Sequence, residues 1–102
     1  MDQLGKLTFE RGTGYVIKCD GEPERIQASS IDGGWKLHEM QAQVGGPIEI
    51  VPGFSHRHEG FILLVDENGT FKKDNQLNLT ASSMARMPLL GNALLIREAD
   101  FH

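Results

Sequence analysis

Two histidines that flank an arginine, His56-Arg57-His58, form the most chemically suggestive triplet in the chain. On an extended segment, side chains two residues apart point to the same side, so these imidazoles could begin a metal site. The remaining ligands would have to come from elsewhere: Glu59, His38 or His102. A closed zinc site needs four ligands and a catalytic site at least three, and no further ligand stands at a fixed spacing. We therefore expect a solvated loop without a metal or another cofactor.

Glu49 is the acidic residue with the most apolar neighbours, because it stands between Ile48 and Ile50. Alternation along a strand places its side chain opposite these isoleucines, where it faces solvent unless another element or a partner chain covers it. Asn78 and Asn92 have the chemistry of cap or turn residues first and of ligand donors second. The residues that we expect to bind a ligand are therefore Glu49, Arg57, Asn78 and Asn92.

The remaining motifs indicate architecture more than chemistry. The glycines of Gly45-Gly46 follow a helical pattern, and a helix C-terminus carries partial negative charge, so they predict a helix cap and not a phosphate loop. Asp66-Glu67-Asn68-Gly69 has the composition of a hairpin turn, whereas a calcium loop needs alternating oxygen ligands. Cys19 lies in an expected strand, where a buried, inert thiol is the expectation. Cationic residues that could hold a nucleotide-like anion are Arg25, Arg57, Lys72, Lys73 and Arg86.

The elements that must position these residues follow from hydrophobic periodicity and from turn residues. Strands are expected at residues 15–19, 24–28, 48–51, 61–65, 70–72 and 93–96, the first two joined as a hairpin through Asp20-Gly21. One helix is expected to run to Val44 with Trp35 and Met40 on its apolar side, and a second helix is expected before Pro88. This order predicts an α+β fold, with a mainly antiparallel sheet of five to six strands and two helices packed on one face. The sequence leaves the strand order open.

Length and charge limit the class of protein. The chain has 102 residues, a mass of 11.3 kDa and a net charge of −4, which predicts one domain over 1–102, with 1–13 as a lead-in and 97–102 as a polar tail. Neither half is basic, so we expect no general nucleic-acid binding. Its apolar runs are too short for a membrane span, and the N-terminus lacks the pattern of a secretion signal. The single cysteine excludes an internal disulfide, and we expect a cytoplasmic location.

Five motifs in a fixed order resemble a known family. They are Val44-Gly45-Gly46 followed by Ile48-Glu49, then Val65 to Gly69, then Asn78-x-x-Ala81-Ser82, and finally Leu90-Gly91-Asn92-Ala93. This order is similar to the small family catalogued as domain of unknown function 3846, found in bacteriophages and mobile elements. Ser82 and Pro47 depart from its pattern, since the family often has threonine and an aromatic residue there. The resemblance covers about residues 35–96, implies a phage or mobile-element setting, and transfers no catalytic residue.

Three functional hypotheses follow. The first is a non-enzymatic binding module that holds a host protein or a small anionic molecule, for example to antagonise a host defence. A homodimer is its companion expectation, since small domains often form pockets between subunits. The alternative is a small hydrolase that uses Glu49 and the His56/His58 loop, which requires these side chains to converge in one cleft. The third hypothesis is a structural or assembly component.

Overall fold

The computed structural model describes residues 3–72 and 75–101. Its strands are β1 (Thr13–Ile17), β2 (Glu24–Gln27), β3 (Ile48–Ile50), β4 (Phe61–Asp66) and β5 (Ala93–Arg97). Its helices are α1 (Leu37–Val44), α2 (Phe54–Arg57) and α3 (Leu79–Ala85), and its 3-10 turns are η1 (Gln3–Lys6), η2 (Gly69–Phe71) and η3 (Glu98–Asp100). Within these residues, no helix is long and apolar enough to cross a membrane.

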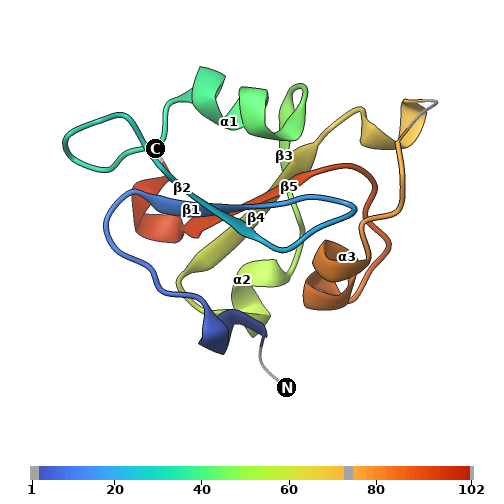
Figure 1. Ribbon diagram of the computed structural model, residues 1–102, viewed down its shortest axis with the longest axis horizontal. Coiled ribbons are helices and arrows are strands. Elements are labelled where there is room, and N and C mark those ends of the chain that lie inside the picture. The colour runs from blue at the N-terminus through green and yellow to red at the C-terminus, as the bar shows by residue number, and fades with distance from the viewer. Residues whose placement is uncertain (1–2, 73–74, 102) are drawn as a thin grey trace.

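The five strands form one antiparallel sheet in the order β2-β1-β5-β4-β3 (Figure 1). The expected β1–β2 hairpin is present, with Val16 paired to Glu24. The last strand in the chain, β5, lies in the centre of the sheet between β1 and β4. Its neighbour β1 is buried along its whole length, β4 is buried from Ile62 to Asp66, and β5 itself is buried from Ala93 to Ile96. The α+β class and the antiparallel sheet are thus confirmed.

Helices cover both faces of this sheet. Helices α2 and α3 lie together on one face, over Leu63, Leu95 and other core residues, and α1 lies on the other face, over Leu64 and Leu94. Figure 1 shows α1 above the strands and α2 and α3 below them. Consecutive apolar residues in β4 and β5 send side chains to both faces, so each face needs a cover. Trp35 packs in the same core cluster as Met40 of α1, but it lies before the helix, which begins at Leu37 and not, as expected, ahead of Trp35.

The C-terminus of α1 has the expected glycine cap, whereas its N-cap residue is Lys36. Gly45 has a left-handed backbone, with φ of 92°, and its N–H donates to the carbonyl of Gln41. A residue with a Cβ would be strained there, so this glycine ends the helix. At the other end, the carboxylate of Glu39 accepts from the backbone N–H of Lys36, which satisfies a donor that the helix leaves free.

Three segments differ from the expectation. Residues 69–71 form the 3-10 turn η2 in place of a returning strand, and Phe54–Arg57 form helix α2 in the expected loop. The tail is also docked: Asp100 is 3 % exposed, it forms an ion pair with Arg97, and it accepts from the N–H of Gly12. These contacts hold the C-terminal segment against the start of β1, and they join positions too distant in sequence for local periodicity to indicate.

Candidate functional site

A polar hollow of about 560 Å³ opens at the end of the sheet where β1 ends and β5 begins. Its lining comes from four separate segments of the chain, and we call it the polar hollow. The residues that line it are Lys18, Cys19, Asp20, Val44, Gly45, Lys72, Asn75, Gln76, Gly91 and Asn92. Three side-chain amides, two ammonium groups, a carboxylate and a thiol therefore surround one volume large enough for a small molecule.

Antiparallel pairing brings the two main walls together. Ile17 pairs with Ala93, so the residues that follow β1 lie beside the residues that precede β5. The backbone of Gly91 is left-handed, with φ of 82°, and its N–H donates to the carbonyl of Gln76 at 2.9 Å. The thiol of Cys19 donates to the same carbonyl at 3.4 Å. Cys19 is partly exposed and lies past the end of β1, which corrects the expectation of a buried thiol in a strand.

The Lys72 ammonium lines a third side of the hollow and is held in place by two contacts. It forms an ion pair with the carboxylate of Asp66 and donates to the carbonyl of Gly45 at 2.6 Å. The Asp66 side chain is only 2 % exposed, whereas the Lys72 side chain is 44 % exposed. Burial acts to raise the pKa of Asp66, but the hydrogen bonds from Lys72 and from the N–H of Asn68, with the Lys72 charge, outweigh it and lower this pKa. Asp66 is therefore an anion held behind the hollow.

Gly46 leaves the space that this buried carboxylate occupies. A Cβ on Gly46 would lie 2.6 Å from Oδ1 of Asp66, a distance at which one of the two must move. The same Oδ1 accepts from the N–H of Asn68 at 2.9 Å. The paired glycines after α1 thus have two tasks, because Gly45 ends the helix and Gly46 admits the carboxylate.

Asn78 lies directly behind the hollow and is fully buried. Its Oδ1 accepts from the N–H of Ala81 at 3.0 Å and caps α3. Its Nδ2 donates to the carbonyls of Ile17 at 2.7 Å and Gly91 at 2.9 Å. One side-chain amide therefore links the end of β1, the turn before β5 and the start of α3. All three of its hydrogen bonds are made to groups within the protein.

Glu49 and Arg57, the other two expected ligand residues, lie outside the hollow's lining. Glu49 is exposed in the edge strand β3, opposite Val65. Arg57 lies at the end of α2, and its guanidinium donates to the carbonyl of Ala85. Of the four residues expected to bind a ligand, Asn92 alone lines the hollow, and Asn78 supports it from behind.

The histidine segment packs helix α2 against α3. A ring nitrogen of His58 lies 3.2 Å from the carbonyl of Met84, and the imidazole packs on Phe54 with centroids 4.6 Å apart. Together with Arg57, His58 binds the last carbonyls of α3, the end where positive charge is favourable. Within the described residues, no hydrogen bond joins Glu49 to either histidine, and no group of three or more His, Cys, Asp and Glu side chains could hold a metal ion.

Removing these caps should destabilise the protein measurably. Arg57→Ala is expected to lower the free energy of unfolding by about 1 kcal/mol, and His58→Ala by a similar amount, because each leaves a carbonyl of α3 without its donor. His56→Ala is the matched control, since His56 is exposed and its loss should stay within about 0.5 kcal/mol. Urea unfolding followed by circular dichroism measures all three. Equal values for His56→Ala and His58→Ala would contradict the capping role.

The expected cationic residues are dispersed. Lys72 lines the hollow, while Arg25 pairs with Glu10 and also donates to Thr13. Arg86 ends α3 in a left-handed conformation, and Lys73 lies outside the described residues. Among the polar lining residues, the sequence reasoning did not predict a site role for Lys18, Asp20, Asn75 and Gln76. The pairing of β1 with β5 would have indicated Lys18, but that pairing was not available from local patterns.

Comparison with protein-family models identifies the family to which the chain belongs. The model described as "Domain of unknown function (DUF3846)" matches residues 13–101, which extends the resemblance through the β1–β2 hairpin and η3. No curated protein and no solved structure matches the chain significantly. Four residues of the motifs that resemble the family belong to this region. Gly45 and Gly91 line the polar hollow, while Asp66 and Asn78 lie directly behind it and contact the lining residues Lys72 and Gly91. The chain is therefore a member of the DUF3846 family.

Proposed function

We propose that the protein is a non-enzymatic binding module and that the polar hollow holds a small anionic ligand. The observation that carries the proposal is the set of polar groups in the hollow that the fold does not use. Within residues 3–72 and 75–101, the side chains of Gln76 and Asn92 make no hydrogen bond. An amide side chain offers both a donor pair and an acceptor, so these two suit a ligand with mixed hydrogen-bonding edges.

Lys18 supplies the cation for such a ligand. Its ammonium lies 3.7 Å from the carboxylate of Glu24, and both side chains are about half exposed, at 49 % and 59 %. An exposed ion pair of this kind contributes about 0–1 kcal/mol, so Lys18 can exchange Glu24 for a ligand anion at small cost. Lys72 acts differently, because it is held by Asp66 and Gly45 and so keeps the wall of the hollow in place.

The chemistry of the lining favours binding over catalysis. Asp66, the carboxylate buried behind the hollow, is already committed to Lys72 and Asn68, which leaves it unsuited to accept a proton from a substrate. In the phage or mobile-element setting that the family resemblance implies, a module of this kind would act by sequestering its ligand from the host. Binding of a host protein, a homodimer and a cytoplasmic location stay predictions of the sequence.

Calorimetric titration tests this proposal. The protein is titrated with mononucleotides, cyclic nucleotides and inorganic phosphate, first at low salt, where screening is weakest. We expect one of these probes to bind and Asn92→Leu to weaken it about tenfold, since the variant leaves a ligand polar group unpaired. Lys18→Gln should weaken the same probe about twofold to fivefold.

The matched control is Lys36→Gln, which removes a cation at the other end of α1 and should leave the affinity unchanged. Absence of heat with every probe would contradict the anionic-ligand proposal. Binding that survives both Asn92→Leu and Lys18→Gln would place the ligand elsewhere and contradict the assignment of the hollow.

A further inference from the structure

A second cavity, of about 380 Å³, lies on the other side of the β1–β2 hairpin loop, between that loop, the end of η1 and helix α3. We call it the hairpin groove. It is lined by Lys6, Leu7, Gly21, Glu22, Pro23, Thr80 and Met84, and it shares no lining residue with the polar hollow. Nothing in the proposed function uses it.

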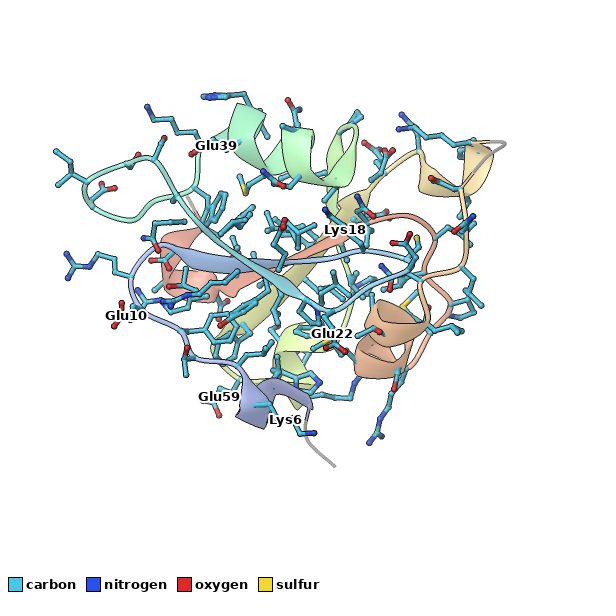
Figure 2. The ribbon with its side chains drawn as sticks, viewed as in Figure 1. Lys6, Glu10, Lys18, Glu22, Glu39 and Glu59 are labelled. Atoms are coloured by element: carbon cyan, nitrogen blue, oxygen red, sulfur yellow. The ribbon has the colours of Figure 1, made fainter. Side chains whose placement is uncertain are left out.

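The groove combines an apolar floor with one charge of each sign. Met84 is 5 % exposed and belongs with Leu7 to the core cluster under α3, so together they offer a hydrophobic contact surface. Lys6 and Glu22 are exposed, and they come from different elements, as Figure 2 shows. Among the described residues, no ion pair or hydrogen bond is formed by the side chain of either one.

We propose that the hairpin groove binds a small zwitterion, between an amino acid and a dipeptide in size, that carries an apolar side chain. Its carboxylate would lie at Lys6, its ammonium group at Glu22 and its side chain on Leu7 and Met84. Charge complementarity selects this class of ligand. A simple anion would meet the Glu22 carboxylate, and a simple cation would meet the Lys6 ammonium, whereas a zwitterion pairs with both.

The volume agrees with this class, because cavities of about 300–1,000 Å³ are typical of small-molecule sites and this groove lies at the small end of that range. Thr80 adds a hydroxyl at the wall, which can donate to or accept from the ligand. Gly21 lines the groove, and a Cβ added there would meet no atom within 4 Å, so this position accepts a substitution that narrows the groove.

The experiment is a two-dimensional ¹H–¹⁵N NMR titration of the full chain with leucine and with the dipeptide alanyl-leucine at millimolar concentrations. We expect the amide signals of Gly21, Glu22 and Thr80 to shift, and those of Gly91 and Asn92 to stay in place. N-acetyl-leucine amide, which has the same side chain and no charges, should bind at least fivefold more weakly. Equal binding of this neutral analogue would overturn the proposal.

Three variants localise the site. Lys6→Gln and Glu22→Gln should each weaken the zwitterion about twofold to fivefold, the range of an exposed ion pair, and Gly21→Leu should abolish binding by narrowing the groove. Lys36→Gln and Glu49→Gln are the matched controls and should have no effect, because Lys36 precedes α1 on the other face of the sheet and Glu49 is exposed in β3, at the opposite edge of the sheet from β2. No shift with either probe, or shifts confined to the polar hollow, would overturn the proposal. Because the polar hollow is tested with anions and with Asn92→Leu, either proposal can fail while the other stands.

Discussion

Asn78→Ala should lower the free energy of unfolding by about 2–4 kcal/mol, the largest effect that we expect from one substitution in this chain. The variant removes the N-cap of α3, which contributes about 1 kcal/mol. It also leaves the carbonyls of Ile17 and Gly91 without the amide that now binds them in the interior. For a domain of this size, the midpoint of thermal unfolding should fall by about 10–25 °C.

Thermal and urea unfolding followed by circular dichroism measure this loss. Asn78→Ser separates the contribution of the helix cap from that of the other two hydrogen bonds. A serine oxygen can still cap α3 but cannot reach both carbonyls, so this variant should recover only about 1 kcal/mol of the lost stability. Asn68→Ala is the matched control, since Asn68 is exposed and should change stability by no more than about 0.5 kcal/mol. A loss for Asn78→Ala as small as that of the control would show that its three hydrogen bonds do not hold the fold together.

The second large effect should come from Lys72→Met, which is expected to cost about 1–3 kcal/mol at neutral pH. The variant leaves the carboxylate of Asp66 ionised and buried without its counter-charge. Breaking a fully buried pair costs about 3–5 kcal/mol. The value here should be smaller, because the Lys72 side chain is 44 % exposed and water screens part of the interaction.

The loss should depend on pH in one direction. The pKa of Asp66 in the folded protein lies below its ordinary value of 3.8, so the ion pair stabilises the fold fully above about pH 4 and loses its contribution as the pH falls through that lowered pKa. The difference between wild type and Lys72→Met should therefore be largest near pH 7 and should narrow towards about pH 3. Urea unfolding across this range measures it, with Lys36→Met as the control. A difference that does not narrow in acid would contradict the role of the Asp66 charge.

The elements of the fold could be predicted from the sequence wherever the residues that determine them lie close together in the chain. The β1–β2 hairpin, the glycine cap of α1 and the asparagine cap of α3 each follow from residues close together in the chain. Two segments were misjudged because local patterns were ambiguous. Thr70 and Phe71 have strand propensity, yet they lie in η2, and Phe54 begins a short helix where glycine and proline neighbours indicated a loop.

The candidate site was harder to predict because it depends on which strands pair. Asn92 was identified through its turn chemistry, but Lys18 and Gln76 become neighbours of Asn92 only after β5 inserts beside β1. Arg57 was predicted to bind a ligand because it is a cation between two histidines. Its role as a cap for α3 depends on a hydrogen bond to the carbonyl of Ala85, 28 residues away. Non-local contacts of this kind leave no periodic trace in a single sequence.

The central position of β5 has a consequence for how the chain acquires its structure during synthesis. Four strands emerge from the ribosome first, as two separate pairs, β1 with β2 and β3 with β4. The two pairs form one sheet only after residues 93–97 are synthesised, because β5 pairs with β1 on one side and with β4 on the other. Until then the inner edges of β1 and β4 are open, and such edges are prone to capture neighbouring chains. Ordering of the nascent protein is therefore delayed to one late step, after which the sheet closes as a unit.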